Sequence, residues 1–428
     1  MNYFQPYAFT ADKSIVTAWD FEIARAAQTP WLAEALAGAG SELFPRFADC
    51  YAQLRALPRG ARRALQGQLA RSQELAAIVP EWLHGEAGHA LQQKLARTLA
   101  GAALLLALGQ GVAQANQINV TAKTPPVIAA DGKCSLIEAI INAEDTSTGL
   151  VHTDCDAGDP AGADSIVLPA KSKHTLTYVR EVYYNSATGL PLITGNITIE
   201  GNSATITRSK KAFDFRLMAV ASGGSLTLND VKMSGGVADK GGAIFNYGSV
   251  TINGGIISKN LASSGGAIYT GNLGTLHINS TTITGNKASY GGGIFSRGSL
   301  ADVIINNSTI SKNSAYDGGG LANLYGNMRV NDCIVTGNKA VRFGGGASNG
   351  KGTFNIDSTT ISKNSATFGG GVFNIAGDFR LYNSTVTGNK AKLGGGVLIV
   401  NSPYGTFVNS GNTFSKNKAP YGPDIAYY

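Results

Sequence analysis

The chain has 428 residues, a formal net charge of +7 and 55 glycines, and only 15% of its residues are charged. This length allows two or three domains. The glycines follow no Gly-X-Y period, which excludes a collagen-like chain. Basic residues and aromatic rings form no recognisable nucleic-acid-binding module, so we predict no nucleic-acid partner.

Residues 1–90 differ in composition from the rest of the chain. They are rich in alanine, leucine, arginine and glutamine, and apolar residues recur at helical spacing between Leu54 and Leu69. Prolines divide this stretch into several short segments. We therefore predict a small α-helical N-terminal extension over residues 1–90.

Residues 91–115 have the form of a secretory signal peptide. Lys94 and Arg97 precede the apolar run 98–108, and Ala113-Gln114-Ala115 supplies the small residues of a cleavage site. We expect export with cleavage after Ala115, which removes residues 1–115 and leaves no stable transmembrane domain. Because signal peptides normally begin a chain, other interpretations stay open: a later start of translation, a retained helical domain with an apolar tether, or a plain buried helix.

Residues 116–164 are expected to cap the open end of the domain that follows. Ser135 and Glu138 form a capping-box signature ahead of an apolar stretch, which predicts a short helix over residues 136–143. A repeat domain needs such a cap because its first unit has no neighbour on one side.

The cysteines bear on the compartment of the exported part. Cys134 and Cys155 flank the expected cap helix and its loop, and a disulfide between them fits a location outside the cytoplasm. Cys333 is expected to be a buried free thiol in place of the threonines of other repeats. The chain contains no metal-ligand spacing, so we predict no metal and no cofactor.

Residues 165–240 contain short alternating stretches that predict irregular β coils. Residues 178–190 interrupt this pattern, and we expect this insertion to overhang one face. Loops that leave a rigid scaffold often carry binding residues. Tyr178, Tyr183 and Tyr184 are therefore candidates for recognition.

Residues 241–428 repeat a unit of about 25 residues that opens with Gly-Gly and closes on Lys-Asn or Gly-Asn. Each unit alternates apolar and polar residues in short stretches separated by glycine and asparagine. No helical pattern fits inside a unit, which favours a parallel β-helix; a β-propeller is the weaker alternative. The closing asparagines are Asn260, Asn286, Asn313, Asn338, Asn364, Asn389 and Asn417. An inward aliphatic column is expected at Ile244, Ile268, Ile294, Leu321, Val372 and Val397.

The segments Gly-Gly-Ala-Ile-Phe at 241–245 and Gly-Gly-Ala-Ile-Tyr at 265–269 resemble the GGAI-type repeats of polymorphic outer-membrane proteins. Related right-handed β-helix proteins of the pectate-lyase-like superfamily share this feature. Residues 134–140, Cys-Ser-Leu-Ile-Glu-Ala-Ile, resemble the CSLREA motif of secreted bacterial β-helix proteins, and residues 421–425 resemble the ending of such domains. The resemblance covers about residues 116–428. It implies a mainly β, right-handed parallel β-helix (solenoid) of about 11–12 coils, but no single function, because this superfamily includes adhesins, lyases, hydrolases and phage tailspikes.

Two polar columns are expected at the turns. We place one register about seven residues before the closing asparagines, at Asn253, Asn279, Asn307, Asp332, Asp357, Asn383 and Asn409. A second, interrupted column is expected at Asn246, Asn323, Asn349 and Asn374. We favour stacked amides that satisfy one another. The alternative is that Asp332 and Asp357 form an acidic pair for catalysis or Ca²⁺ binding.

Two further columns are candidates for ligand binding. One lysine stands in the closing turn of each coil, including Lys287, Lys312, Lys339 and Lys363. Stacked ammonium groups attract anionic polysaccharide, although a solvated turn that protects strand edges is the plainer interpretation. One large apolar residue per coil stands just before the glycines: Tyr290, Tyr316, Phe343, Phe368 and Leu393. Facing outward these rings suit stacking on sugars, and facing inward they form an aromatic core.

We predict an exported, extracellular or cell-surface protein that binds glycans or surfaces without catalysis, as an adhesin or matrix-type protein does. A lyase needs clustered carboxylates for Ca²⁺ and a base, and a hydrolase needs carboxylates that converge on one bond. The regular coils show no acidic face. Two alternatives stay open: a polysaccharide lyase or glycoside hydrolase that uses Glu181, Glu200 and Asp214, and a purely structural surface rod.

Overall fold

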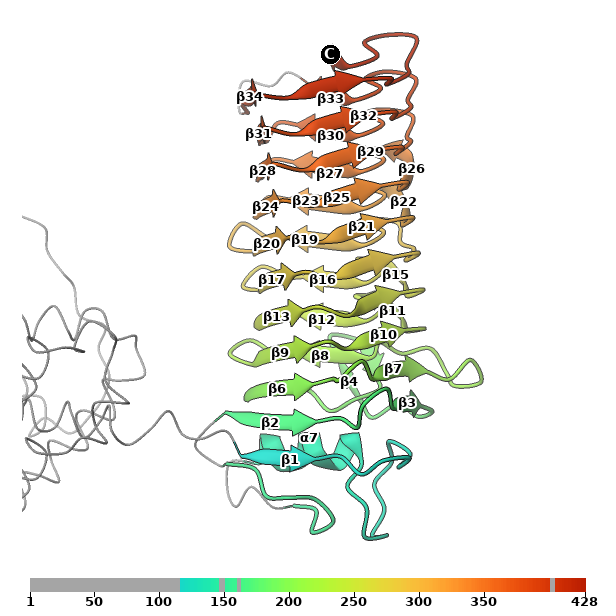
Figure 1. Ribbon diagram of the computed structural model, residues 1–428, viewed down its shortest axis with the longest axis vertical. Helices are drawn as coiled ribbons and strands as arrows, with labels where there is room; N and C mark the ends of the chain where they lie inside the picture. Colours follow the sequence, from blue (N-terminus) through green and yellow to red (C-terminus); the bar gives the residue numbers. More distant parts are fainter. Residues whose placement is uncertain (1–115, 146–150, 160–162, 401–404) are drawn as a thin grey trace, which may run out of the picture. The chain divides into compact units, whose positions relative to one another are not determined.

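The computed structural model describes residues 116–145, 151–159, 163–400 and 405–428. The predicted helical extension, the signal-like segment and the cleavage site after Ala115 lie outside these residues. The described part of the chain is a parallel β-solenoid in which short strands stack coil upon coil (Figure 1). The prediction of a mainly β, parallel solenoid is confirmed.

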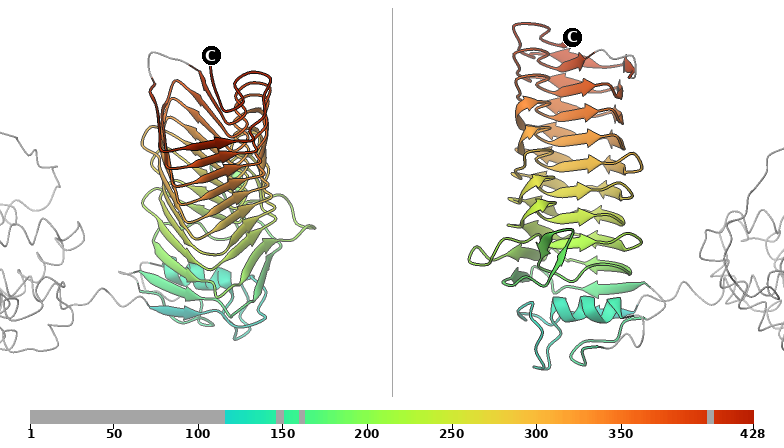
Figure 2. Two further views of the ribbon diagram at one scale, coloured as in Figure 1. Left: turned by 45° about the horizontal axis from the view of Figure 1, so that its top comes forward. Right: turned by 180° about the vertical axis from the view of Figure 1, so that it is seen from behind.

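Three long parallel sheets run along the solenoid (Figures 1 and 2). The first sheet has 11 strands: β1 (Gln117–Asn119), β2 (Asp164–Val167), β6 (Asn196–Glu200), β9 (Ser225–Asn229), β13 (Ser249–Asn253), β17 (Thr275–Asn279), β20 (Asp302–Asn306), β24 (Asn327–Asn331), β28 (Thr353–Asp357), β31 (Asp378–Tyr382) and β34 (Phe407–Ser410). The second has 10: β3 (Lys173–Leu176), β7 (Thr205–Arg208), β10 (Lys232–Ser234), β14 (Ile256–Ser258), β18 (Thr282–Thr284), β21 (Thr309–Ser311), β25 (Ile334–Thr336), β29 (Thr360–Ser362), β32 (Thr385–Thr387) and β35 (Thr413–Ser415). The third has nine: β8 (Met218–Val220), β12 (Ile244–Asn246), β16 (Ile268–Thr270), β19 (Ile294–Arg297), β23 (Leu321–Leu324), β27 (Ala347–Gly350), β30 (Val372–Ile375), β33 (Val397–Val400) and β36 (Ile425–Tyr427).

The solenoid has about nine complete turns, fewer than the 11–12 coils that we predicted. A complete turn needs one strand in each long sheet, and the third sheet begins only at β8. In the coil of β2 and β3, an antiparallel hairpin of β4 (Glu181–Tyr183) and β5 (Ser186–Thr188) precedes the return to the first sheet. The excess lies in the irregular region before Gly241, where the sequence indicated four or five coils.

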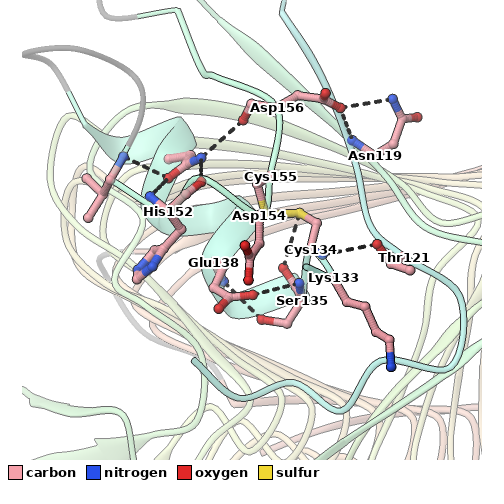
Figure 3. The surroundings of a disulfide bond; sticks show 12 residues. Asn119, Thr121, Lys133, Cys134, Ser135, Glu138, His152, Asp154, Cys155 and Asp156 are labelled. Atoms are coloured by element: carbon pink, nitrogen blue, oxygen red, sulfur yellow. Dashed lines mark hydrogen bonds between the residues drawn. A yellow bond between two sulfur atoms is a disulfide. The ribbon is translucent and has the colours of Figure 1, made fainter. Parts of the chain in front are cut away.

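The N-terminal end is covered by the helix α7 (Leu136–Glu144), close to the predicted residues 136–143 (Figure 3). Its capping box is complete: the Glu138 backbone N–H donates to Ser135 Oγ at 3.3 Å, and the Ser135 N–H donates to Glu138 Oε2 at 2.9 Å. A disulfide joins Cys134 to Cys155 beside the start of the helix. Leu136 and Ile140 are fully buried, so the helix supplies the apolar contacts that the first coil lacks.

The main core is the interior of the solenoid, where equivalent residues of successive coils stack in register. The predicted aliphatic column pairs Ile244 with Ile268, Ile268 with Ile294, and Ile294 with Leu321. Each of these side chains is fully buried. No coil buries its own apolar face, so neighbouring coils stabilise one another.

The repeated glycines have a steric cause. At Gly292, an added Cβ would press on the carbonyl oxygen of Gly319 in the next coil and on the carbonyl oxygen of Ser314, closer than real Cβ atoms approach. The same contact recurs at the equivalent glycine of each regular coil. Glycine is therefore needed here so that the backbones of successive coils can pass each other closely.

The strongest polar column lies at the closing asparagines, inside the solenoid. Asn313 Oδ1 accepts the backbone N–H of Asn286 at 2.9 Å and its Nδ2 at 3.0 Å, and Asn313 Nδ2 donates to the Ile283 carbonyl at 2.9 Å. The pattern repeats from Asn260 to Asn417. These side chains are buried, and we call this column the inner ladder. Sequence analysis used these residues as markers of the period and missed their role.

The predicted register before the closing asparagines is partly wrong. The side-chain amides of Asn229, Asn253, Asn279, Asn306 and Asn331 form a chain of hydrogen bonds of 2.9–3.1 Å at the edge of the first sheet. Asn307 and Asp332 instead occupy the next position, where the backbone φ is 49° and 53°. The second predicted column is present, since Asn323, Asn349 and Asn374 are linked at 2.7–2.9 Å. Thr270 and Ser296 interrupt it.

Cys333 is a buried free thiol within a third polar column. Its Sγ accepts the backbone N–H of Ser308 at 3.4 Å, and its own N–H donates to Thr359 Oγ1 at 3.2 Å. The equivalent positions are therefore Ser308 and Thr359, one residue before the threonines that we predicted. Burial raises the pKa of the thiol to about 11, which keeps it protonated at neutral pH.

Candidate functional site

A fourth line of parallel pairing runs along one edge of the solenoid, between the second and third sheets. It contains β11 (Val237–Lys240) paired with β15 (Leu261–Ser264), and β22 (Ser314–Asp317) paired with β26 (Lys339–Phe343). Isolated bridges continue the pairing through the remaining coils, as far as Lys418 and Tyr421. We call this feature the lateral ladder.

The lateral ladder brings a lysine column and an aromatic column together, three residues apart. Its first position holds Lys287, Ser314, Lys339, Ser365, Lys390 and Lys418 in successive coils. Its last position holds Tyr290, Asp317, Phe343, Phe368, Leu393 and Tyr421. Two of the predicted ligand-binding columns therefore lie side by side on one edge.

The predicted lysine column is in fact two columns that alternate. Lys287 and Lys339 follow the buried asparagine and lie on the lateral ladder. Lys312 and Lys363 precede it, in left-handed turns with φ of 54° and 56°. In the other coils this turn position holds a glycine, such as Gly285 with φ of 66°. The two positions were merged in the prediction because both lysines adjoin the closing asparagine, although they lie on opposite sides of it, two residues apart.

The alternation spaces the positive charges along the edge. Lys390 and Lys418 stand in adjacent coils, whereas the four predicted lysines stand two coils apart within their columns, which is about 10 Å at the usual spacing of strands. This distance is close to the Debye length of about 8–10 Å at physiological salt, so their mutual repulsion is largely screened. All four predicted lysines are exposed. The edge therefore presents a continuous positive field toward solvent.

The aromatic column lies outside the main core. Tyr290 is 45% exposed and Tyr316 is 46% exposed. Phe343 stacks on Phe373 with ring centroids 4.3 Å apart and lies 5.6 Å from Phe368, in an outer cluster on the third sheet. Tyr316 is one residue out of the predicted column, because Asp317 pairs with Tyr290 in the preceding coil and with Phe343 in the next one.

Arg342 organises the centre of this surface, and sequence analysis missed it. Its Nε and Nη2 donate to the two carboxylate oxygens of Asp317 at 3.1 and 2.6 Å. The guanidinium lies over the rings of Tyr316 at 4.9 Å and Phe343 at 4.3 Å. The hydrogen bonds to Asp317 raise the pKa of Arg342. An arginine one coil after a tyrosine is the signal that could have indicated the contact.

The predicted insertion folds as the hairpin β4–β5 against the outer face of the third sheet. Tyr184 and Asn185 form its two-residue turn with φ of 49° and 56°, as hairpin turns require. The Tyr184 ring stacks on Tyr247 at 4.7 Å, and Tyr183 lies 5.8 Å from Phe245. Tyr178 is 73% exposed and takes part in none of these ring contacts.

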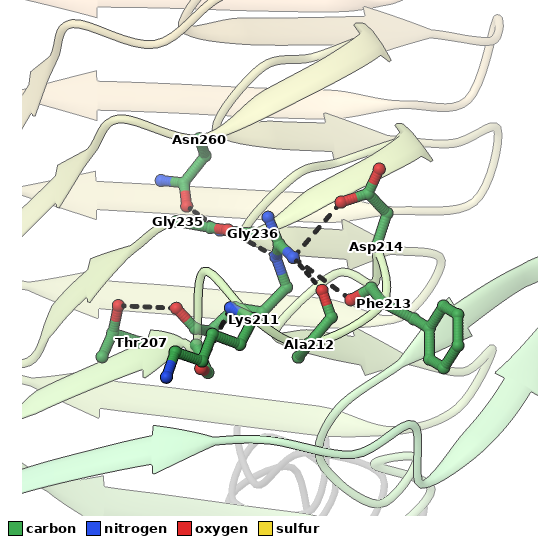
Figure 4. A network of polar contacts seen from close by, with 10 residues as sticks. Thr207, Lys211, Ala212, Phe213, Asp214, Gly235, Gly236 and Asn260 are labelled. Carbon is green, nitrogen blue, oxygen red and sulfur yellow. Dashed lines mark hydrogen bonds and ion pairs between the residues drawn. The ribbon is translucent and has the colours of Figure 1, made fainter.

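A second loop projects beside the hairpin's coil and carries an exposed aromatic ring (Figure 4). Arg208 holds this loop: its Nη1 donates to the carbonyl oxygens of Ala212 at 2.9 Å and Phe213 at 3.2 Å, and pairs with Asp214 at 3.2 Å. The Phe213 side chain is 88% exposed. Nothing in the local sequence pattern indicated that this ring would face solvent.

The two carboxylates named as a catalytic alternative lie in neighbouring coils, and the Asp332 backbone N–H donates to the Asp357 carbonyl at 3.2 Å. Asp357 pairs in the first sheet with Asn331 and Tyr382, so Asp332 and Asp357 do not share the column that we predicted. Asp332 is exposed in the adjoining turn. Within the described residues, no group of three or more His, Cys, Asp or Glu side chains is placed to hold a metal ion.

The three carboxylates of the irregular coils are engaged separately. Glu181 accepts the backbone N–H of Leu192, Glu200 accepts Asn229 Nδ2 at 2.7 Å, and Asp214 pairs with Arg208. Each has a structural partner of its own. They do not form the convergent pair that glycoside hydrolysis uses.

The geometry defines the class of protein as a parallel β-solenoid with a basic and aromatic edge. Residues 280–297 match the Chlamydia polymorphic membrane protein repeat. This segment contains Lys287 and Tyr290 of the lateral ladder. The match and the solenoid together fit a polymorphic-membrane-protein-like β-helix, and the repeat suggests a surface-exposed protein of a bacterial outer membrane.

The other comparisons add no relative. No curated protein and no solved structure matches the chain. Across the residues that the structure describes, no helix has the length and apolar character needed to span a membrane.

Proposed function

We propose that this chain is an exported bacterial surface protein that binds polysaccharide through the lateral ladder and does not cleave it. The observation that carries this proposal is the pair of half-exposed rings, Tyr290 and Tyr316, next to a column of exposed lysines. The rings are held in place by the sheet and by Arg342, so little conformational entropy is lost when a ligand binds.

The chemistry of the edge favours an acidic glycan. Tyrosine rings offer an apolar face to the C–H groups of a sugar and a hydroxyl to its polar rim. Lysines along the same edge attract carboxylate or sulfate groups and increase the rate of encounter. Because the positions repeat with every coil, a linear polymer that lies along the edge meets several equivalent contacts at once.

Export is part of the proposal. The signal-like segment before Ala115 and the disulfide between Cys134 and Cys155 both suit a protein that acts outside the cytoplasm. We place the mature protein at the cell surface or in the extracellular space, with residues 1–115 removed. An adhesin or a matrix component has this combination of features.

The test is binding and cleavage by the full chain on a panel of neutral and acidic polysaccharides. We expect retention on acidic polymers, weakened by salt, without new reducing ends or unsaturated products. The double variant Lys287→Gln and Lys339→Gln is expected to reduce retention, with Lys171→Gln, a lysine away from the lateral ladder, as the matched control. Release of products would overturn the non-catalytic assignment, and absence of both binding and cleavage would favour a structural rod.

A further inference from the structure

Arg216 is a charged side chain buried without a partner. The residue is fully buried, and its three guanidinium nitrogens find no hydrogen-bond acceptor among the described residues. Burial lowers its pKa to about 10, which leaves the guanidinium charged at neutral pH. An unpaired buried charge is costly, and proteins normally supply a carboxylate or several carbonyl groups to such an arginine.

The position of Arg216 in the repeat is unusual. Met218 pairs with Ile244, so Arg216 occupies the position of Gly242, in the column where the regular coils carry glycine. Beside it, Thr188 pairs with Arg216 through a parallel bridge. The Thr188 hydroxyl is also buried and has no partner within the described part of the chain. Two unsatisfied donors therefore come from adjacent, paired positions.

The surroundings of Arg216 are aromatic. Its guanidinium lies over the Phe245 ring at 4.5 Å. Phe245 in turn stacks on Tyr247 at 5.0 Å and on Tyr269 at 5.4 Å. The hairpin residue Tyr184 lies 5.3 Å from Phe245. Aromatic rings and a cation are the groups that recognise the ring and the charge of an acidic sugar.

The nearest negative charge does not neutralise the arginine. Asp239 on β11 raises the pKa of Arg216, but this carboxylate is exposed and no ion pair joins the two side chains. The strand β5 of the hairpin lies against β11, and its residue Thr188 pairs with Arg216, so the hairpin packs beside Arg216. Hydrogen bonds from the Arg216 N–H to the Ala187 carbonyl at 3.0 Å and from the Gly189 N–H to the Arg216 carbonyl at 2.9 Å hold β5 in place. Val182 is 67% exposed and Tyr184 is 51% exposed, so the tip is the part of the hairpin that can move.

We propose that Arg216 and Thr188 form a binding site for the carboxylate of an acidic sugar, and that the tip of the β4–β5 hairpin, at Tyr184 and Asn185, moves to admit it. The planar guanidinium would donate two parallel hydrogen bonds to the carboxylate, and the Thr188 hydroxyl a third. The sugar ring would lie against Tyr247, in place of the Tyr184 ring that stacks on it. This site rests on the proposed glycan binding for the nature of the ligand, but it is separate from the lateral ladder.

The experiment is calorimetric titration of the full chain with sodium glucuronate, glucose and acetate. We expect glucuronate to bind at least tenfold more tightly than either glucose or acetate, because the site recognises the carboxylate and the ring together. Arg216→Met is expected to weaken glucuronate binding at least tenfold, and Thr188→Val by several fold. Equal binding of acetate and glucuronate, or of glucose and glucuronate, would overturn the assignment.

Two controls separate this site from a structural role and from non-specific pairing with surface cations. Arg329→Met removes a partly exposed arginine of the first sheet, away from both candidate surfaces, and should leave glucuronate binding unchanged. Arg216→Met should raise the thermal midpoint without ligand, because it removes an unpaired buried charge while retaining an apolar stem. If that variant does not fold, Arg216→Lys keeps the charge without the planar fork and should still bind glucuronate several fold more weakly.

Hydrogen exchange of the hairpin tests the opening step. The backbone amides of residues 181–188 are expected to exchange more slowly when glucuronate is bound, in the native chain and not in Arg216→Met. Unchanged affinity for glucuronate in both Arg216→Met and Arg216→Lys would overturn the proposal. Glucuronate binding lost in Arg216→Met while retention on acidic polysaccharide persists would support this site and leave the lateral ladder intact; the reverse pattern would support the ladder alone.

Discussion

The regular coils from Gly241 onward and the irregular coils before them satisfy their polar groups in different ways. In the regular coils each buried asparagine of the inner ladder bonds to its own copy in the next coil, at 2.8–3.1 Å. In the irregular coils a residue has no such copy. Arg216, Thr188, His174 and Asp164 all carry buried polar atoms without a partner among the described residues.

Where coils repeat, buried polar side chains therefore bond to the equivalent side chain of the next coil. Where the repeat is interrupted, buried polar atoms are left without such a partner. The same lesson holds within the regular coils: Thr270, Ser296 and Asn323 carry the unsatisfied atoms there, where the second asparagine column is interrupted. Unsatisfied groups persist in proteins mostly where function or strain retains them. This contrast supports the proposed binding site at Arg216, in the irregular coils.

The largest expected effect is in the inner ladder. Asn313→Ala removes an acceptor for two hydrogen bonds from Asn286 and leaves buried donors without a partner. We expect a loss of about 3–5 kcal/mol in the free energy of unfolding. Asn253→Ala, in the exposed chain of amides on the first sheet, should cost less than about 1 kcal/mol. Denaturant unfolding measures both, and equal losses would contradict the importance of the inner ladder.

The second effect concerns the N-terminal cap. The disulfide closes a loop between Cys134 and Cys155, which are 21 residues apart. Its removal in the Cys134→Ser and Cys155→Ser double variant should cost about 3 kcal/mol. Cys333→Ser is the matched control, since this thiol is free and hydroxyl groups occupy the equivalent positions of other coils. A thermal midpoint unchanged in the double variant would show that the cap needs no covalent link.

A pair of glycine substitutions tests whether close packing of the backbone requires glycine. Gly292→Ala places a Cβ against backbone carbonyl oxygens of the next coil and should cost about 1–3 kcal/mol. Gly285→Lys should cost less, about 1 kcal/mol, because an added Cβ meets nothing within 4 Å and only the strain of a side chain at φ of 66° remains, which Lys259, Lys312 and Lys363 also carry. Similar midpoints for both variants would contradict the steric account.

The smallest effect is a pH dependence in the irregular region. Burial raises the pKa of Asp164 from 3.8 to about 6, while the N–H of Asp159 opposes the shift and the charges of Asp159 and Glu144 reinforce it. The folded state therefore holds the proton more tightly than the unfolded state, so Asp164 lowers stability as the pH rises from about 4 to about 6. The free energy of unfolding of Asp164→Asn, relative to that of the native chain, should increase as the pH rises through this window and stay constant above it. A pH-independent difference in midpoint would rule out this titration.

The sequence predicted most of the fold because the repeat fixes it. The alternation of apolar and polar residues around Ile244 and Ile268, together with the glycines before them, predicts the same structure in every coil. The polar register was harder: the true offset before the closing asparagine is seven residues in each coil, as from Asn306 to Asn313. The predicted column lay one residue too late at Asn307, Asp332 and Asn383 and one residue too early at Asn409.

The candidate site was predictable in composition but not in arrangement. Tyr290 and Lys287 lie on one ladder, whereas Tyr316 lies one residue before the column, because Asp317 stands between it and the glycines. Arg342 and Arg216 were missed, since each depends on contacts with another coil. The hairpin was expected to overhang a face, but only the three-dimensional fold shows that it packs beside Arg216.

The most direct test of the central claim is the affinity of the full chain for an acidic polysaccharide that it retains, measured for Tyr290→Ala with Tyr316→Ala. Tyr325→Ala, with a ring 47% exposed but away from the lateral ladder, is the matched control. We predict that the double variant binds about tenfold more weakly or worse, since each ring contributes about 1 kcal/mol of stacking, and that the control is unchanged. Equal affinities for the native chain and the double variant would contradict binding at the lateral ladder.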